Sequence, residues 1–179
     1  MPPQNDKFKI TSKELKDKLN RCFTASPLLA SHSFPFMLEK LSSSSMVAKK
    51  ESLKTLKLMI SDLTIKVVRN YCEMIWNHLQ NEAFNSFDEV VQTECIETIA
   101  SLSAVLSSTK DKFITVQYDS IAEKVISDIF EKCRQEIEKD PDTLTGILAF
   151  NILKAIMKKS TNLCYYVIEN FMIDYSLSK

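Results

Sequence analysis

The sequence predicts an all-α protein, because it nearly lacks glycine, keeps proline outside its apolar-periodic segments and repeats one short residue pattern. Gly146 is the only glycine among 179 residues, so the chain has almost no residue suited to tight hairpins or phosphate-binding loops. With 45% apolar residues, this length suffices to bury the core of one domain or of a short repeat array. The prolines, which suggest breaks and helix starts, are Pro2, Pro3, Pro27, Pro35 and Pro141.

Capping and break signals predict the first two helices. Thr11 and Glu14 form a T-x-x-E capping box ahead of a helix of about 12 residues. A break at Ser26–Pro27 ends this helix. We expect a second, shorter helix over residues 33–41, with Pro35 in its first turn.

Four consecutive serines at residues 42–45 predict a loop that caps the next helix, over residues 46–61. Apolar residues recur at helical spacing along one face of that helix, and lysines recur along another. The apolar residues are Leu53, Leu56 and Ile60, and the lysines are Lys50, Lys54 and Lys57. A further helix of about 18 residues is expected around residues 67–79, from the same apolar periodicity.

The second half of the chain carries two more capping signals. Ser86–Glu89 is a capping box for a helix that ends near residue 107, and residues 115–139 follow as one long helix. Asp140–Pro141 offers an N-cap and a first-turn proline for the next helix. A last helix is expected to begin near Ser160.

A short pattern recurs in these helices. Residues 51–56 (ESLKTL) and 94–99 (ECIETI) stand 43 residues apart, each with a valine four places earlier, at Val47 and Val90; residues 153–156 (LKAI) form a weaker third copy. Two helices per period of this length are typical of HEAT or armadillo-type repeats. We therefore predict a HEAT/armadillo-like α-solenoid of three to four antiparallel helix pairs, right-handedly stacked. Its predicted core is Leu53, Leu56, Ile60, Ile75, Ile96, Ile99, Leu102, Ile129, Leu148, Ile152 and Leu153.

The cysteines and histidines do not form a pattern typical of metal or redox chemistry. The five cysteines are widely spaced without a C-x-x-C pair, and His32 and His78 stand 46 residues apart. We expect buried thiols that pack as small hydrophobic groups, with no metal, no cofactor and no catalytic residues. No secretory signal or apolar run long enough to span a membrane is visible, which favours a soluble protein of a reducing compartment.

Five charged residues are the candidate partner-binding positions. A lysine stripe on the exposed face of a helix is usually only solvated, and that alternative remains open here. In a solenoid, however, the second helices of successive repeats form one continuous surface. The repeat would then align Lys54, Glu97 and Lys154 in a row of alternating charge, beside Lys50 and Lys57.

The distribution of charge bears on nucleic-acid binding. Residues 1–70 hold 13 Lys/Arg against 6 Asp/Glu, whereas residues 71–145 hold 6 against 15, so we expect an electrically bipolar molecule. The acidic middle and a pI near 6.7 argue against direct binding of nucleic acid. A protein-interaction scaffold is the leading hypothesis, and a nucleic-acid-associated factor of transcription or repair is the alternative.

The region of residues 19–60 resembles a known family. The matching segments, in order, are Thr24–Pro27 (TASP), Pro35–Leu41 (PFMLEKL), the serine loop at residues 42–45, and Leu53–Leu56 (LKTL). This order is similar to that of the HEAT-repeat adaptor of the cytosolic iron–sulfur-cluster targeting complex, the methyl-methanesulfonate-sensitivity "nineteen" family. Since members of that family are much longer, residues 1–179 are interpreted as a single repeat domain from an N-terminal region.

The resemblance implies a non-catalytic scaffold in the cytoplasm and nucleus. It implies protein partners, namely the iron–sulfur targeting subunits and the apo iron–sulfur proteins that they supply, such as DNA helicases and polymerases. It also implies links to excision repair and transcription, with no small-molecule substrate and no membrane.

The last predicted helix has apolar residues around much of its circumference and no partner helix after it. Such a surface is unusual on a stable monomer, so we expect self-association of the chain or a tail that folds back. The residues concerned are Leu163, Tyr166, Val167, Phe171, Met172 and Ile173.

Overall fold

The structure, a computed structural model, describes residue 18, residues 21–108 and residues 120–173. All regular elements in these ranges are helices and none is a strand, which confirms the all-α prediction. The capping box at Thr11 and the predicted helix start near residue 115 lie outside the described residues. The elements are α2 (Ala30–Leu41), α3 (Met46–Asp62), α4 (Ile65–Arg69), α5 (Cys72–Asn85), α6 (Glu89–Ser107), α7 (Ser120–Lys139), α8 (Leu144–Lys159), α9 (Thr161–Val167) and the π-helical turn η2 (Ile168–Ile173).

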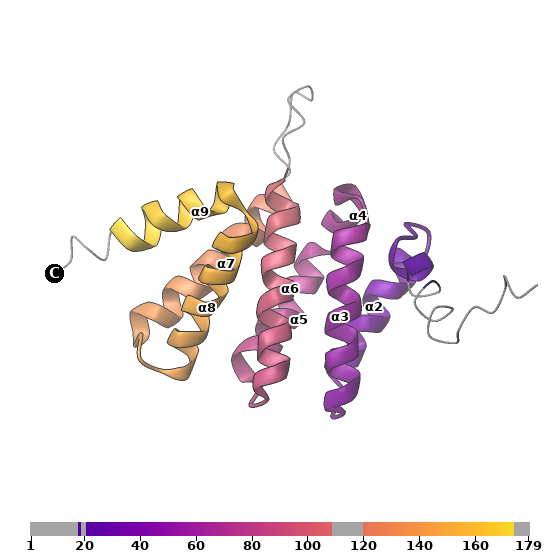
Figure 1. Cartoon of the computed structure of the whole chain (residues 1–179), viewed down its shortest axis with the longest axis horizontal. Coiled ribbons are helices and arrows are strands. Elements are labelled where there is room, and N and C mark those ends of the chain that lie inside the picture. Colours follow the sequence, from indigo (N-terminus) through magenta and orange to yellow (C-terminus); the bar gives the residue numbers. More distant parts are fainter. Residues whose placement is uncertain (1–17, 19–20, 109–119, 174–179) are drawn as a thin grey trace, which may run out of the picture.

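The helices form two layers (Figure 1). Helices α2, α5 and α7 make one layer, and α3, α6 and α8 make the other. Each helix of the first layer packs on its successor in the second, so that α2 contacts α3, α5 contacts α6 and α7 contacts α8. Within the second layer α6 lies between α3 and α8, while α9 packs mainly on α8. This arrangement is an all-α helical solenoid.

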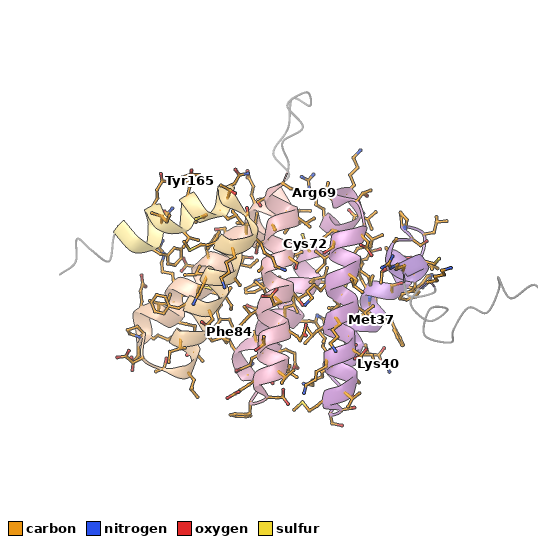
Figure 2. The ribbon with its side chains drawn as sticks, viewed as in Figure 1. Met37, Lys40, Arg69, Cys72, Phe84 and Tyr165 are labelled. Atoms are coloured by element: carbon orange, nitrogen blue, oxygen red, sulfur yellow. The ribbon has the colours of Figure 1, made fainter. Side chains whose placement is uncertain are left out.

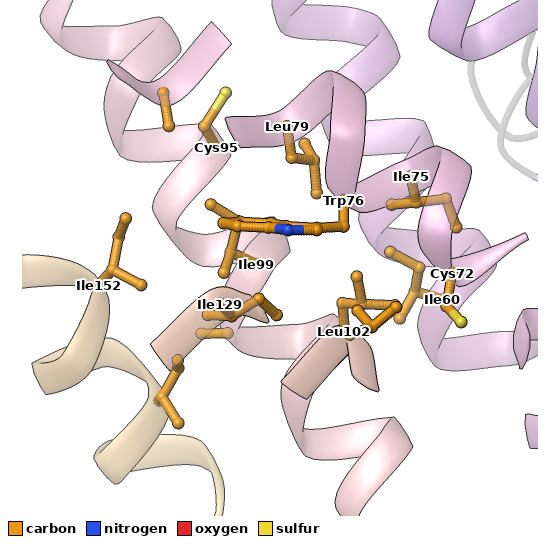
Figure 3. Close-up of a cluster of buried hydrophobic side chains, with 14 of the residues drawn as sticks. Ile60, Cys72, Ile75, Trp76, Leu79, Cys95, Ile99, Leu102, Ile129 and Ile152 are labelled. Atoms are coloured by element: carbon orange, nitrogen blue, oxygen red, sulfur yellow. The ribbon is translucent and has the colours of Figure 1, made fainter. Parts of the chain in front are cut away.

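One continuous core runs between the layers. Every residue of the predicted core is buried except Ile96, which is partly buried at its edge. Trp76 of α5 is buried in this core among Leu79, Ile99 and Ile129, as Figure 3 shows. The helical periodicity in the sequence was therefore sufficient to place core residues on α3, α5, α6, α7 and α8.

Two helix boundaries differ from the sequence prediction. Helix α2 begins at Ala30, so Pro35 lies inside the helix rather than in its first turn. Pro35 is tolerated there because it and Ser31, whose carbonyl loses a helical partner, both face solvent. The helix predicted around residues 67–79 is divided into α4 and α5, because at Asn70 and Tyr71 the backbone tightens to i→i−3 hydrogen bonds.

Two predicted N-caps are wrong and one is confirmed. Asp88, not Ser86, caps α6 by accepting hydrogen bonds from the amides of Val90 and Val91, both at 2.9 Å. Thr143, not Asp140, caps α8, since the carboxylate of Asp140 already accepts from the amide of Asp142 in the preceding turn. The serine loop caps α3 as predicted, since the Ser45 hydroxyl accepts a hydrogen bond from the amide of Ala48.

The C-terminal helix is partly covered by α7. The ring of Phe130 lies 4.7 Å from that of Tyr166 and 6.0 Å from that of Phe171, and the Arg134 guanidinium lies 5.0 Å from the Phe171 ring. The side chain of Ile173 lies outside the described residues. Phe171 is thus partly buried against the fold, and self-association of the chain stays a prediction.

Candidate protein-interaction surface

The second layer carries ion pairs that join neighbouring helices. They connect α3 to α6 and α6 to α8, and their side chains are between one fifth and one half exposed. The pairs are Lys50 Nζ–Asp88 Oδ2 at 3.5 Å, Lys57 Nζ–Glu94 Oε2 at 3.0 Å and Lys159 Nζ–Glu97 Oε2 at 3.2 Å.

The pairs between α3 and α6 do not join aligned positions of the repeat. Helices α3 and α6 run parallel, since Lys50 and Lys57 meet Asp88 and Glu94 in the same chain order. With the 43-residue period of the repeat, Lys50 aligns with residue 93 and Lys57 with residue 100. Each of these lysines instead contacts an acid that stands earlier in α6 than its aligned position. The sequence analysis assumed that residues at the same repeat position are neighbours, and it therefore did not predict these pairs.

The five predicted partner-binding residues fall into two groups. Lys50, Lys57 and Glu97 are engaged in pairs between helices. Lys54 is exposed and pairs with Glu51 of its own helix at 3.3 Å, and Lys154 is exposed on α8. The exposed cations of the predicted row are thus Lys54 and Lys154, while its acid, Glu97, is held by Lys159 from α8.

The N-terminal end of α6 is an electrostatic junction with α3 and α5. The amide of Val91 and the ammonium of Lys50 lower the pKa of Asp88 below its ordinary value of 3.8, although partial burial opposes them. Lys49 contacts Glu82 of α5 at 2.6 Å, and both side chains are largely shielded from solvent. These contacts fix α3, α5 and α6 relative to one another at this end of the layer.

A cavity of about 510 Å³ lies on the first layer, over α5. Its lining is mainly polar but includes Phe84, labelled in Figure 2. Lys132 Nζ lies 5.0 Å from the centroid of the Phe84 ring. Such a surface offers hydrogen-bond donors and acceptors to a polar partner. The amide residues of the lining are Asn77, Gln80, Asn81 and Asn85.

The prediction of buried thiols holds for Cys72, Cys95 and Cys133 but is wrong for Cys22, which is exposed, and for Cys164, which is partly exposed. Burial raises the pKa of Cys95 and of Cys133 to about 12, so both stay protonated at neutral pH. Among the described residues, no cluster of three or more histidine, cysteine, aspartate or glutamate side chains is placed to hold a metal ion. None of the described helices is long and apolar enough to cross a membrane.

Sequence reasoning missed the apolar residues that this layer exposes. Val47 and Val90 were identified only as markers of the repeat, yet they are 73% and 52% exposed at the N-terminal ends of α3 and α6. The signal that could have found them is helical position. Val47 lies off the stripe of Leu53, Leu56 and Ile60 that α3 buries, and Val90 holds the equivalent repeat position in α6.

Comparison with known proteins gives consistent matches. The family model MMS19_N, described as "Dos2-interacting transcription regulator of RNA-Pol-II", matches residues 1–85. The MMS19 nucleotide excision repair protein homolog of Dictyostelium discoideum is 30% identical over 152 residues, which are 85% of this chain and 13% of that protein. The homolog of Bos taurus is 25% identical over 171 residues, 96% of this chain and 16% of that protein.

A fungal relative extends the same similarity. The DNA repair/transcription protein MMS19 of Saccharomyces cerevisiae is 33% identical over 81 residues, which are 45% of this chain and 8% of that protein. The chain therefore spans less than a fifth of the length of these relatives. Since the matches agree on one family and two of them cover most of the chain, the protein belongs to the MMS19 family, whose members are named for DNA repair and transcription.

Proposed function

We propose that this chain is a non-catalytic interaction scaffold, part of an adaptor that joins the cytosolic iron–sulfur assembly machinery to apo-proteins of DNA repair and replication. The observation that carries the proposal is a helical solenoid with one continuous α3–α6–α8 layer, in a chain of the MMS19 family. Solenoids bind partners along such extended surfaces. The names of the relatives, which refer to nucleotide excision repair and transcription, support the DNA-linked part of the proposal.

In this proposal the cluster chemistry belongs to the partners. The raised pKa values of the buried Cys95 and Cys133 thiols oppose the deprotonation that cluster ligation requires. The chain instead contributes shape and charge, with Lys54 and Lys154 exposed on the layer. The cytoplasm and the nucleus are the proposed sites of action.

Affinity purification of the tagged chain from cells, followed by mass spectrometry, tests the proposal. We expect enrichment of cytosolic iron–sulfur assembly subunits or of apo iron–sulfur proteins. A bait with Lys54→Glu and Lys154→Glu should recover less of them. The control carries Lys66→Glu, at an exposed lysine of α4 outside the layer, and should behave like the wild type. Recovery of neither class of protein by the wild-type bait would contradict the proposal.

Direct association with nucleic acid is the second candidate, favoured by the excess of basic residues in the first 70. Three of these lysines, Lys49, Lys50 and Lys57, already contact acids of α5 and α6, so we expect little binding. Gel shifts with duplex and single-stranded DNA at rising salt measure it. Micromolar binding that weakens steeply with salt would favour this second function.

A further inference from the structure

The repeat places an apolar residue at a position that the core does not use. Six residues before Leu53, Ile96 and Leu153 stand Val47, Val90 and Ile147, the last of these in the third copy of the repeat. The three side chains are 73%, 52% and 48% exposed. Packing within the described fold therefore does not account for this recurring apolar position.

These residues share one end of the second layer. The N-terminal ends of α3, α6 and α8 lie at the lower end of the helices in Figure 1. Three more exposed apolar side chains belong to the same ends, and one of them, Phe87, is fully exposed. Scattered exposed hydrophobic residues need no explanation, but a group at one edge is typical of an interaction site. We define the apolar edge as Met46, Val47, Phe87, Val90, Leu144 and Ile147.

Acidic groups surround the apolar edge and outnumber the cations. The lysines of this end are Lys40, Lys49, Lys50 and Lys139. Glu82, Asp88 and Glu136 engage Lys49, Lys50 and Lys139, and Lys40 lies over the ring of Phe36. The acids there are Glu82, Asp88, Glu89, Asp140 and Asp142, of which Glu89, Asp140 and Asp142 are exposed. An approaching partner therefore meets apolar side chains flanked by negative charge.

The helix N-termini at this edge do not make it an anion site. First-turn amides of α3, α6 and α8 donate to the side chains of Ser45, Asp88 and Thr143. Since capping groups already occupy these donors, phosphate or carboxylate would gain little there. Charge complementarity selects a cationic partner instead.

We propose that the apolar edge docks an amphipathic helix of a protein partner, with Lys or Arg along the flanks of its apolar face. Packed helices lie about 8–10 Å apart, and seven residues of a helix rise about 10.5 Å. Apolar residues at i and i+7 of the partner therefore match the successive contact points on α3, α6 and α8. This inference rests on the proposed scaffold function and gives that function a definite class of ligand.

The test uses a labelled, amidated peptide of about 18 residues that forms an amphipathic helix of leucine and lysine, followed by fluorescence anisotropy. We expect the triple variant Val47→Ser, Val90→Ser, Ile147→Ser to weaken binding about tenfold or more. The matched control is Leu28→Ser, Phe36→Ser, Tyr165→Ser, which are exposed apolar residues outside the apolar edge, and its affinity should stay at the wild-type value. A peptide with glutamate in place of lysine should bind at least about tenfold more weakly.

Several results would overturn the inference. They are the absence of peptide binding to the wild type, equal binding by the apolar-edge variant, and equal binding of the glutamate peptide. Light scattering supplies a fourth. If the wild type is a dimer and the apolar-edge variant is a monomer, the apolar edge binds a second copy of this chain and not a partner helix. Circular dichroism melting should show that both variants fold like the wild type. The readout is separate from the purification experiment, so the scaffold function and the docking mode can fail independently.

Discussion

Glu136 is a buried carboxylate held by two lysines of its own helix. Its Oε1 lies 2.8 Å from Lys132 Nζ and 3.0 Å from Lys139 Nζ. The hydrogen bond from Lys132, followed by those from Lys139 and Thr145, lowers the pKa of Glu136 from 4.5 to about 2, against the opposing effect of burial. Because the folded-state pKa is lowered, the stabilisation is present above pH 4.5 and is lost as the pH falls towards 2.

We predict that Glu136→Gln lowers the free energy of unfolding at pH 7 by about 1–2 kcal/mol. The difference from the wild type should narrow as the pH falls below 4.5, since the wild-type side chain then loses its charge as well. Urea denaturation between pH 7 and pH 3 measures this. Glu138→Gln, at an exposed position of the same helix, is the control. A difference that does not change with pH would show that the lysine contacts are unimportant.

Glycine is needed at position 146 because the backbone of Asp140 and Pro141 lies close to it, and not because of an unusual backbone angle. A Cβ atom at this position would lie 2.5 Å from the carbonyl oxygen of Asp140 and 2.9 Å from the carbonyl carbon of Pro141. Alanine is the better helix former by about 1 kcal/mol, but the clash with backbone atoms outweighs that gain. We predict that Gly146→Ala destabilises the fold by about 1–3 kcal/mol.

Thermal denaturation distinguishes this steric cost from helix propensity. Asn151→Ala, at an exposed position of α8, is the matched control and should raise stability by a few tenths of a kcal/mol. If both alanine variants were more stable than the wild type, the turn at Asp140–Pro141 would have to be free to move away from α8.

At the level of single residues, the sequence predicted burial better than capping. The spacing of Leu53, Leu56 and Ile60 was enough to place them in the core. Ser86 and Asp88 are both capable N-cap residues, and the sequence alone could not choose between them. In the structure the N-cap is Asp88, which accepts hydrogen bonds from two first-turn amides and also forms an ion pair with Lys50 of α3. That second contact is long-range and is invisible to a local motif.

At the level of the elements, a residue at the break between α4 and α5 contacts another helix. The ring of Tyr71 stacks on that of Phe34 from α2, with centroids 4.8 Å apart. Periodicity over residues 67–79 predicted one helix because Val68, Tyr71 and Ile75 keep helical spacing across the break. Long-range packing of this kind cannot be read from a single segment.

The ion pairs between α3 and α6 make a prediction about stability. Lys50→Glu with Lys57→Glu removes both pairs and places like charges opposite Asp88 and Glu94. Partly exposed pairs are worth about 0.2–1 kcal/mol each, so we expect a loss of about 1–2 kcal/mol. This expectation differs from that for a merely solvated stripe, whose reversal would leave stability unchanged.

Reversing the acids as well should restore much of the loss. The quadruple variant adds Asp88→Lys and Glu94→Lys, and the coupling free energy from chemical denaturation isolates the pairs. Its recovery will be incomplete, because Asp88 also caps α6. Lys54→Glu, whose partner is in its own helix, is the control and should have little effect. No coupling between the two pairs of substitutions would show that the contacts contribute nothing.

At the level of the whole molecule, the uneven charge of the sequence is partly neutralised by folding. The basic first third contributes Lys49, Lys50 and Lys57, and these meet acids of the middle third across one interface. The sequence composition predicted an electrically bipolar molecule. It could not show that the repeat places the basic helix α3 beside the acidic residues of α5 and α6. The apolar edge was likewise present in the sequence, as Val47 and Val90, but its exposure depends on how the helices stack.

The solenoid also predicts how stability is distributed. Helix α6 contacts α3, α5, α7 and α8, whereas α2 and α9 each lie at one end of the described array. In a stack held by nearest-neighbour interfaces, the end units open at a lower free-energy cost than the centre. We predict that amide hydrogen exchange is slowest in α6 and fastest in α9 and α2.

Two core substitutions sharpen this last prediction. Leu38→Ala, in α2, should raise exchange mainly in α2 and α3, because its interface lies at the end of the stack. Leu102→Ala, in α6, should raise exchange in every helix, because it weakens the interfaces on both sides. Each substitution of a buried leucine lowers the free energy of unfolding by about 2–5 kcal/mol, so the two variants can be compared at a similar loss of stability.

Mass spectrometry of peptic fragments measures the exchange of each helix separately. A uniform rise across all helices in both variants would mean that the chain unfolds as one cooperative unit, without the independent ends that a solenoid implies.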